Sequence, residues 1–448
     1  PLGLAAAVAA VTAGYSGVTQ AQAELANNSL GDLAIVPYYT TAGDFVTGLH
    51  IINTNDERTV TVKLRLRRGS DSMDALDFNV ILSPNDEWTG FIDDSSGQVV
   101  FATDDNSCTA PILPGGRAVM PGLFAEGAGE GYIEVIGMGS SDSNEPISIA
   151  ALHGSDGVPL NCQAVESNFF RNAIGPNTGD TGEKGVYSSD TTYQICTDDV
   201  LARTGIGGFG ATCASESLEV LENDYRSTDN VLKVSFFHRD AASGLEFGNS
   251  AVHLRNFSNV AMMSNQEIQS ATSFDAYGYL FPDLNGGSPA DTPRNRFTFV
   301  REALGATAII NDWSVAAARN VSTDWVVTLP GQYTMLDLFQ YQLSLFDADV
   351  DCLTVEEADA TIEVNPENEY CDERDLPVDL FLANTVFDRE EQTFSNPDSG
   401  LVISPAVGNP PGQDTLETEV TVIQWTDGSI EPVLPSEYAK KYDVSALG

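Results

Sequence analysis

From Leu33 onward, apolar and polar residues alternate along short runs, which is the period of a β-strand with one buried face rather than that of a helix. The runs are rich in β-branched and aromatic residues, and Asn, Asp, Gly, Ser and Pro separate them. The pattern passes through AIVPYYT, FVTGLHIINT, TVTVKLRLR, ALDFNVILS, EWTGFID, QVVFATDD, GYIEVIGMG and ISIAALHG. It predicts an antiparallel β-sandwich over residues 30–160.

The chain changes character over residues 163–230, where Gly, Ser, Thr and Asp dominate and apolar periodicity is weak. We expect a loop region held by a disulfide, with ASESLEVLENDY as its one candidate helix. Strand patterns return over residues 231–435, in NVLKVSFFHRD, SAVHLRNF, TDWVVTLPG, LFQYQLSLFDAD, PVDLFLANTVFD, GLVISPAV and ETEVTVIQW. RFTFVREALGATAII in the same range is amphipathic and predicts a short helix.

These patterns together predict a mostly β protein. Two antiparallel, immunoglobulin-like sandwich domains, 30–160 and 231–435, would carry long loops and one or two short helices. Residues 436–448 are expected to form a tail. No repeat of constant period is visible, which argues against a solenoid or a propeller.

The first 23 residues have the features of a secretory signal peptide. A small-residue apolar run from Leu4 to Val11 precedes AQA at Ala21–Ala23, which is an A-x-A cleavage site. The alternative is an N-terminal helix of the mature protein. No later stretch has the length and hydrophobicity of a transmembrane helix.

Six cysteines suit the oxidising compartment that such a signal implies. Short closures in turn-rich segments favour Cys196–Cys213 and Cys352–Cys371, which leaves Cys108–Cys162, although fifteen connectivities are formally open. No Cys or His spacing typical of zinc is present.

The chain is strongly acidic, with 65 Asp and Glu against 21 Lys and Arg and a formal net charge of −44. This charge excludes general attraction to nucleic acid and disfavours an anionic membrane, because both need a basic surface. Only five of the cations are lysines. An acid excess with little Lys suits salty water, where self-repulsion is screened.

One stretch runs against this charge. ERTVTVKLRLRRGS holds Arg58 and then four cations within six residues: Lys63, Arg65, Arg67 and Arg68. Alternation places the valines and leucines of this strand on one face and the cations on the other, which is expected to meet solvent. Two interpretations follow: cross-strand pairs with acids of the neighbouring strand, or an assembly face that docks an acidic surface of another copy or an anionic glycan.

An acidic loop, FDADVDCLTVEEAD, is the one candidate metal site. Asp347, Asp349 and Asp351 are spaced so that their oxygens can converge on Ca²⁺. Cys352 and Ala358 stand where an EF-hand needs Gly and Glu, so the loop is not an EF-hand. A solvated acidic turn is the alternative, and no other cofactor is expected.

Catalytic motifs are weak. The G-x-G-x-x-G at Gly205–Gly210 follows no strand pattern, so we interpret it as a loop rather than a dinucleotide site. G-x-S-x-G and H-E-x-x-H are absent from the sequence. The four histidines and four tryptophans lie in or beside strand patterns, which favours packing roles.

Three segments, LDFNVILSPNDEWTG, GYIEVIGMG and TDWVVTLPG, in this order resemble a group of uncharacterised exported β-rich surface proteins of Gram-negative bacteria. The resemblance implies export to the cell surface and β architecture. It carries over no site residue.

The sequence therefore favours a secreted cell-surface protein that is structural or assembly-forming and has no catalytic activity. We expect it to form a homo-oligomer or polymer. The alternatives are a glycan- or surface-binding adhesin and, less favoured, an extracellular hydrolase.

Overall fold

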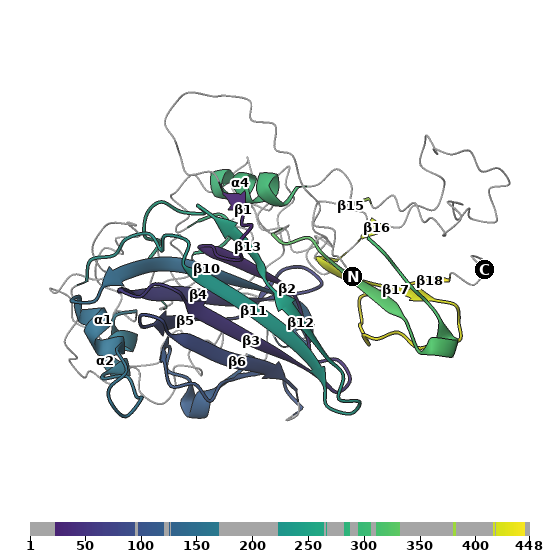
Figure 1. Ribbon diagram of the computed structural model, residues 1–448, viewed down its shortest axis with the longest axis horizontal. Helices are drawn as coiled ribbons and strands as arrows, with labels where there is room; N and C mark the ends of the chain where they lie inside the picture. Colours follow the sequence, from purple (N-terminus) through teal and green to yellow (C-terminus); the bar gives the residue numbers. More distant parts are fainter. Residues whose placement is uncertain are drawn as a thin grey trace, which may run out of the picture.

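The computed structural model describes residues 23–94, 97–120, 125, 127–169, 223–263, 266, 282–286, 294–305, 311–331, 380–381, 415–416 and 418–443. Two antiparallel sheets pack face to face as a sandwich (Figure 1). The mostly β, antiparallel sandwich class is thereby confirmed, while the immunoglobulin-like topology stays a prediction.

The first sheet has seven strands. In spatial order they are β1 (Glu24–Leu25), β13 (Val252–Arg255), β2 (Leu33–Thr40), β10 (Glu130–Asp142), β4 (Arg58–Arg68), β5 (Asp74–Leu82) and β8 (Cys108–Ala110). The second sheet has six strands. In spatial order they are β12 (Glu246–Ser250), β11 (Leu232–Asp240), β3 (Phe45–Asn53), β6 (Glu87–Asp93), β7 (Val100–Ala102) and β9 (Arg117–Val119). A short 3₁₀ turn, η1 (Pro114–Gly116), precedes β9.

The core between the sheets follows the sequence alternation. Leu64 and Leu66 of β4 point inward and lie in one cluster with Phe78 of β5 and Trp88 of β6, all of them buried. Trp88 stacks on Phe101, with ring centroids 5.4 Å apart. Apolar burial of this extent is the main term that stabilises a sandwich of this size.

The predicted start of a second domain at residue 231 is wrong. β11 pairs with β3 along its whole length, from Leu232 opposite Asn53 to Asp240 opposite Phe45. β13 pairs with β2 in the other sheet. Strands that follow α2 in the chain thus complete both sheets, and local patterns cannot show such a long-range pairing.

The outer face of the seven-stranded sheet is covered by later parts of the chain. Buried Met262, Leu284 and Val300 lie in one cluster with Tyr132 and Ile136 of β10. Val300 belongs to α4 (Arg294–Leu304), which confirms the predicted helix and lies beside β1 (Figure 1).

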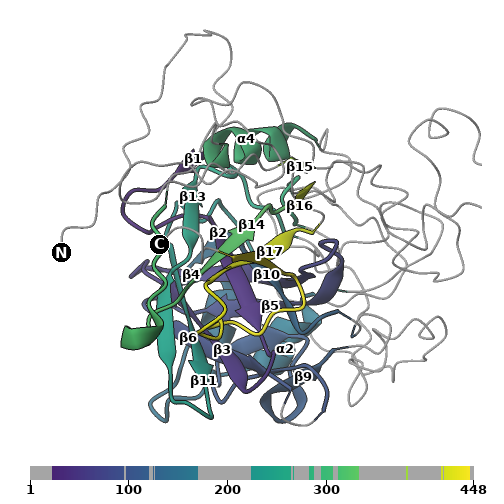
Figure 2. The same ribbon diagram turned by 90° about the vertical axis from the view of Figure 1, so that its right-hand side faces the viewer.

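A three-stranded sheet completes the cover (Figure 2). It consists of β14 (Thr323–Thr328), β17 (Val420–Thr426) and β18 (Ala439–Asp443), with η4 (Ala317–Arg319) before β14. β18 runs parallel to β17, so the prediction that 436–448 is only a tail is wrong. A separate pair joins β15 (Leu380–Phe381) to β16 (Thr415–Leu416).

Two short helices form a lobe at one end of the sandwich, α1 (Pro146–Ala151) and α2 (Cys162–Ser167). The segment ISIAALHG was expected to be a strand, and this is wrong. Pro146 at the first helical position favours the helix, and Ile147, Ala150 and Ala151 bury one helical face.

Candidate functional site

The cationic row of β4 lies inside the protein and not on its surface. The face assignment from alternation is correct, because Val62, Leu64 and Leu66 enter the core while the cations face the other way. That outer face, however, is covered. Lys63, Arg65 and Arg67 are each 0% exposed and Arg68 is 6% exposed, so the prediction of a solvent-exposed assembly face is wrong.

Each of these cations meets a carboxylate. Lys63 pairs with Asp77 and Arg65 with Asp74, both on β5, and Arg68 pairs with Asp71 in the turn. The guanidinium of Arg67 donates from Nε and Nη2 to the two oxygens of Glu134 on β10, at 3.1 Å each. We call these eight residues the ion cluster; they are Lys63, Arg65, Arg67, Arg68, Asp71, Asp74, Asp77 and Glu134. The predicted cross-strand pairing is therefore present, in a buried setting.

The ion cluster also holds the segment that covers it. The Lys63 ammonium donates to Oε1 of Gln266 at 2.9 Å, and Arg65 donates to the carbonyl of Pro282 at 3.1 Å. The amide of Gln266 donates in turn to Asn79 of β5 at 3.0 Å. The row thus ties residues some two hundred positions later to the sheet.

Burial governs the protonation of this region. Loss of water lowers the pKa of the Lys63 ammonium to about 8 and raises the pKa of the Asp77 carboxyl, although each group partly offsets the effect on the other. Asp283, next to the Pro282 carbonyl, is buried as well, and burial raises the pKa of its carboxyl to about 6 against the opposing charges of Arg65 and Arg67. The cluster is a structural element that holds the covering chain.

The histidines are packed or paired, as their strand positions suggested. Burial lowers the pKa of His238 to about 4, and the ring of His253 accepts a hydrogen bond from the Val234 amide at 2.8 Å. His50 lies 2.9 Å from Glu87 on the neighbouring strand.

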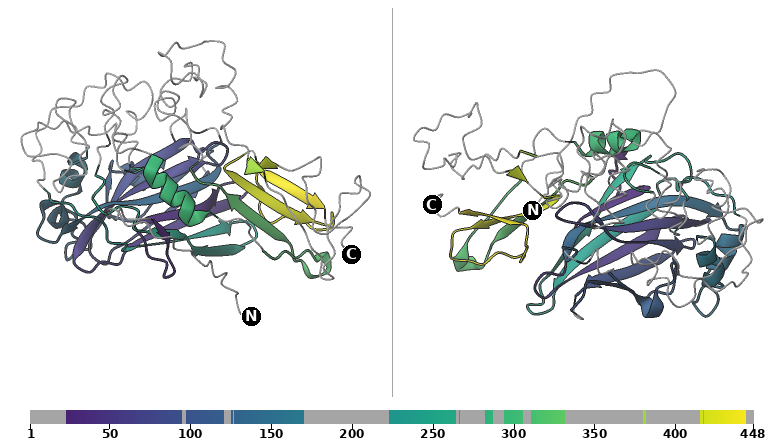
Figure 3. Two further views of the ribbon diagram at one scale, coloured as in Figure 1. Left: turned by 90° about the horizontal axis from the view of Figure 1, so that it is seen from above. Right: turned by 180° about the vertical axis from the view of Figure 1, so that it is seen from behind.

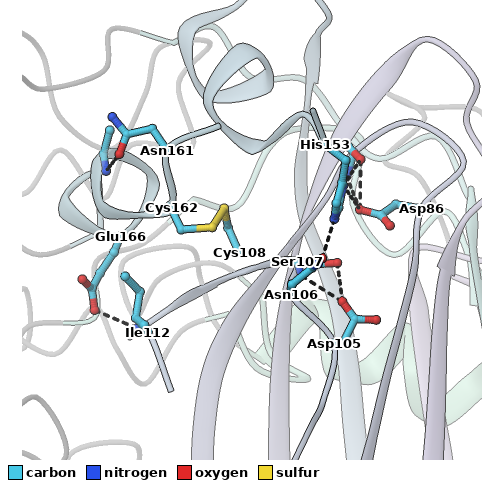
Figure 4. The surroundings of a disulfide bond; sticks show 12 residues. Asp86, Asp105, Asn106, Ser107, Cys108, Ile112, His153, Asn161, Cys162 and Glu166 are labelled. Carbon is cyan, nitrogen blue, oxygen red and sulfur yellow. Dashed lines mark hydrogen bonds and ion pairs between the residues drawn. A yellow bond between two sulfur atoms is a disulfide. The ribbon is translucent and has the colours of Figure 1, made fainter. Parts of the chain in front are cut away.

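Ser83, Asp86 and His153 have the residue types of a hydrolytic triad but a different geometry. Figure 4 shows His153 and Asp86 beside each other. Nδ1 of His153 lies 3.2 Å from the Ser83 hydroxyl and 3.6 Å from Asp86, so serine and acid share one ring nitrogen. Nε2 faces Asn106 Oδ1 at 2.9 Å. A triad needs the serine and the acid on opposite nitrogens, so this group ties the lobe to the sandwich.

The disulfide expected between Cys108 and Cys162 is confirmed, and it joins β8 to α2 (Figure 4). Cys196, Cys213, Cys352 and Cys371 lie outside the described residues. Asp347, Asp349 and Asp351 of the predicted Ca²⁺ loop also lie outside them.

In the part of the chain that the structure describes, no group of three or more His, Cys, Asp or Glu side chains is placed to hold a metal ion. Over the same residues, no helix has the length and apolar character needed to cross a membrane.

Three tryptophans and a tyrosine pack together on the far side of the three-stranded sheet. Trp425 is buried at the centre, with Trp313 stacked on it at 5.5 Å between ring centroids and Trp325 edge-on at 4.8 Å. Tyr442 of β18 lies at 5.2 Å. Trp313, Trp325 and Tyr442 are partly exposed.

The lobe carries an apolar surface that the sequence patterns did not predict. Ile149, Leu152, Val158 and Leu160 are 50%, 47%, 49% and 60% exposed, and we call them the lobe patch. Leu152 follows Ile149 by about one helical turn, and the Leu160 amide donates to the Leu152 carbonyl at 3.1 Å. The patch was not predicted because ISIAALHG was assigned as a strand. A strand would bury alternate residues, whereas the helix α1 leaves Ile149 exposed.

The lobe patch is rigidly held. The disulfide anchors α2, and the Asn161 side chain caps that helix by accepting from the Ala164 amide at 3.1 Å. The turn between the helices is closed by a 2.8 Å bond from the Gly154 amide to the Val158 carbonyl. Asn106 binds the Gly157 carbonyl at 2.8 Å.

Comparison with known proteins gives no relative: no family model, curated protein or solved structure matches this chain.

Proposed function

We propose that the protein is a secreted cell-surface structural protein that assembles with copies of itself and has no catalytic role. The observation that carries the proposal is the lobe patch, a group of four large aliphatic side chains each about half exposed or more. Exposed apolar groups of this kind mark interaction surfaces. The resemblance to exported surface proteins and the Cys108–Cys162 disulfide support secretion.

The charge around the lobe patch favours a second copy as its partner. From residue 146 to residue 165, Asp156 is the one Asp, Glu, Lys or Arg, in a chain of formal charge −44. Two such molecules repel one another over most of their surface. The four side chains of the lobe patch carry no charge, although Glu145, Glu166 and Asp86 lie near the lobe. A two-fold contact would bring the same uncharged patch from each molecule together.

The expected strength of this contact is modest. Covering the exposed half of an aliphatic side chain contributes roughly 1 kcal/mol, so two patches supply several kcal/mol. Association costs on the order of 4–15 kcal/mol in lost freedom. The contact alone should therefore be weak and concentration-dependent, and a stable assembly needs a further contact.

A glycan- or surface-binding adhesin is the second candidate. The observation in its favour is the aromatic cluster around Trp425, where Trp313, Trp325 and Tyr442 are partly exposed and could stack on sugar rings. The same four side chains pack on one another as the hydrophobic core of the three-stranded sheet. A structural role therefore explains them without a glycan, and this candidate ranks second.

Leu160→Asp tests the proposal, because it places a charge in the lobe patch at its most exposed position. We expect self-association, measured by sedimentation velocity over a concentration series, to weaken at least tenfold. Ser155→Asp is the matched control, since it adds the same charge at an exposed position of the same turn. Equal sedimentation of Leu160→Asp and wild type at every concentration would rule the patch out as an interface.

A further inference from the structure

The strand β12 forms one margin of the six-stranded sheet, and within the described residues nothing pairs with its outer side (Figure 1). Glu246, Phe247, Gly248 and Asn249 are exposed, and Ser250 is half-buried. An edge strand of this kind presents a row of backbone donors and acceptors that can bind another strand.

The hydrogen bonds to β11 show which backbone groups face outward. The Asp240 amide donates to the Leu245 carbonyl, and the Ala251 amide donates to the Val234 carbonyl, each at 2.9 Å. In an antiparallel pair, residues alternate between bonding the partner strand and facing away from it. Phe247 and Asn249 therefore bond β11, whereas the amide and carbonyl groups of Glu246, Gly248 and Ser250 point away from the sheet.

Glu246, which lies 4.0 Å from Arg239, is the one charged side chain of β12, and most other devices that protect an edge are missing. The strand contains no Pro and no Lys, and its register with β11 runs without a bulge. The other three margins of the sandwich, in the described residues, are shorter strands: two residues in β1 and three each in β8 and β9. β8 is further fixed by the disulfide at Cys108.

The sequence of β12 is compatible with pairing to itself. Antiparallel pairing about Gly248 sets Glu246 opposite Ser250 of the second copy and Gly248 opposite Gly248. No two charged side chains then face each other directly, which matters between molecules of charge −44. Glu246, Gly248 and Ser250 are the residues whose backbone amide and carbonyl groups point outward. Each of these pairs can therefore form two N–H···O=C hydrogen bonds between the copies.

We propose that β12 pairs antiparallel with β12 of a second copy across a two-fold axis at Gly248, which joins the two six-stranded sheets into one. This inference rests on the proposed function, because it names a second contact of the same self-assembly. One local change accompanies it. The Ser250 amide donates to the Asn249 side-chain oxygen at 2.8 Å and would donate instead to the carbonyl of Glu246 of the second copy.

The two contacts lie at opposite ends of the sandwich. Figures 1 and 3 show α1 and α2 at one end and the β11–β12 hairpin at the other. A molecule that uses both two-fold contacts has a neighbour on each side, so the copies extend into a linear polymer with alternating interfaces. Neither contact alone can pass beyond a dimer.

The test removes one contact at a time and measures the size of the assembly by sedimentation velocity and light scattering. Glu246→Pro deletes an outward amide at the first residue of the strand, where Pro is tolerated. Glu246→Ala is the matched control, because it removes the same side chain and keeps the amide. Ser250→Pro deletes a second outward amide. The same result from both variants would show that the loss comes from the missing hydrogen bonds and not from a distortion at position 246.

We expect wild type and Glu246→Ala to polymerise, Glu246→Pro and Ser250→Pro to stop at dimers, and Glu246→Pro with Leu160→Asp to be monomeric. In the unmodified protein, hydrogen exchange at Gly248 should slow at least tenfold above the association concentration, while Phe247 stays protected throughout.

Polymers of unchanged size from both proline variants, with fast exchange at Gly248, would overturn the β12 contact and leave the lobe contact standing. A wild type that is monomeric at every concentration would overturn the proposed function and the β12 contact together.

Discussion

Arg67 shows how much a single position contributes when its charge is buried with a partner. Its guanidinium and the Glu134 carboxylate are both 0% exposed, and two hydrogen bonds join them. A buried ion pair is weak evidence of net stabilisation, but removing one partner leaves an uncompensated charge. Arg58, on the same strand, pairs with Asp142 and Asp229 while remaining 23% exposed.

Arg67→Met should therefore lower the free energy of unfolding by about 3–5 kcal/mol, whereas Arg58→Met should lower it by about 0–1 kcal/mol. Urea denaturation followed by tryptophan fluorescence measures both. Adding Glu134→Leu to Arg67→Met should recover most of the loss, because no lone charge remains. Equal losses at positions 58 and 67 would contradict the buried pairing.

The buried carboxyl of Asp283 makes the free energy of unfolding depend on pH. Burial raises the pKa of its carboxyl from 3.8 to about 6, so between these values the folded protein binds more protons than the unfolded chain. The contribution of Asp283 to the free energy of unfolding therefore falls as pH rises from about 4 to about 6, by up to about 3 kcal/mol. Asp283→Asn should lack this fall, and its stability relative to wild type should rise over that range.

His238 provides a control of opposite sign. Burial lowers the pKa of its ring from 6.5 to about 4, so the unfolded chain binds the proton first and wild type loses stability as pH falls through this range. His238→Gln should remove that loss. Parallel pH curves of unfolding for Asp283→Asn and wild type would show that the Asp283 carboxyl titrates like an exposed one.

At the scale of elements, the sequence predicts most of what is local. Alternation assigns β4 and β10 as strands and places the correct side chains of β4 in the core. Amphipathic spacing assigns α4, and short closures leave Cys108–Cys162 as the remaining pair. Each of these depends on residues near one another in the chain.

The sequence-based predictions are wrong where an element packs against residues that are distant in the chain. The cations of β4 point away from the core, but alternation cannot show that Gln266 and Pro282 will cover them. In ISIAALHG, apolar residues fit a strand as well as a helix, and packing of Ile147, Ala150 and Ala151 decides for α1. The lobe patch depends on that packing of α1. The outer edge of β12, unpaired within the described residues, depends on the pairing of β11 with β3, so local patterns could predict neither.

At the scale of the whole molecule, the ion cluster changes the interpretation of the net charge. Each of its four cations has a carboxylate partner inside the fold. The cluster is therefore neutral, and the formal charge of −44 belongs to the rest of the chain. Exposed cations such as Arg117, Arg239 and Lys441 remain on other elements, but the cationic row itself is not available to another copy. We therefore expect association to rely on apolar and backbone contacts.

The dependence of self-association on salt is the measurement that best distinguishes apolar and backbone contacts from pairing of opposite charges. Sedimentation velocity of the wild-type protein from about 0.05 to about 1 M NaCl spans the range from weak to strong screening. We expect the average mass to rise with salt, because screening removes repulsion between acidic surfaces while apolar and backbone contacts persist. An average mass that falls as salt is added would contradict this expectation, since that behaviour requires opposite charges across the interface.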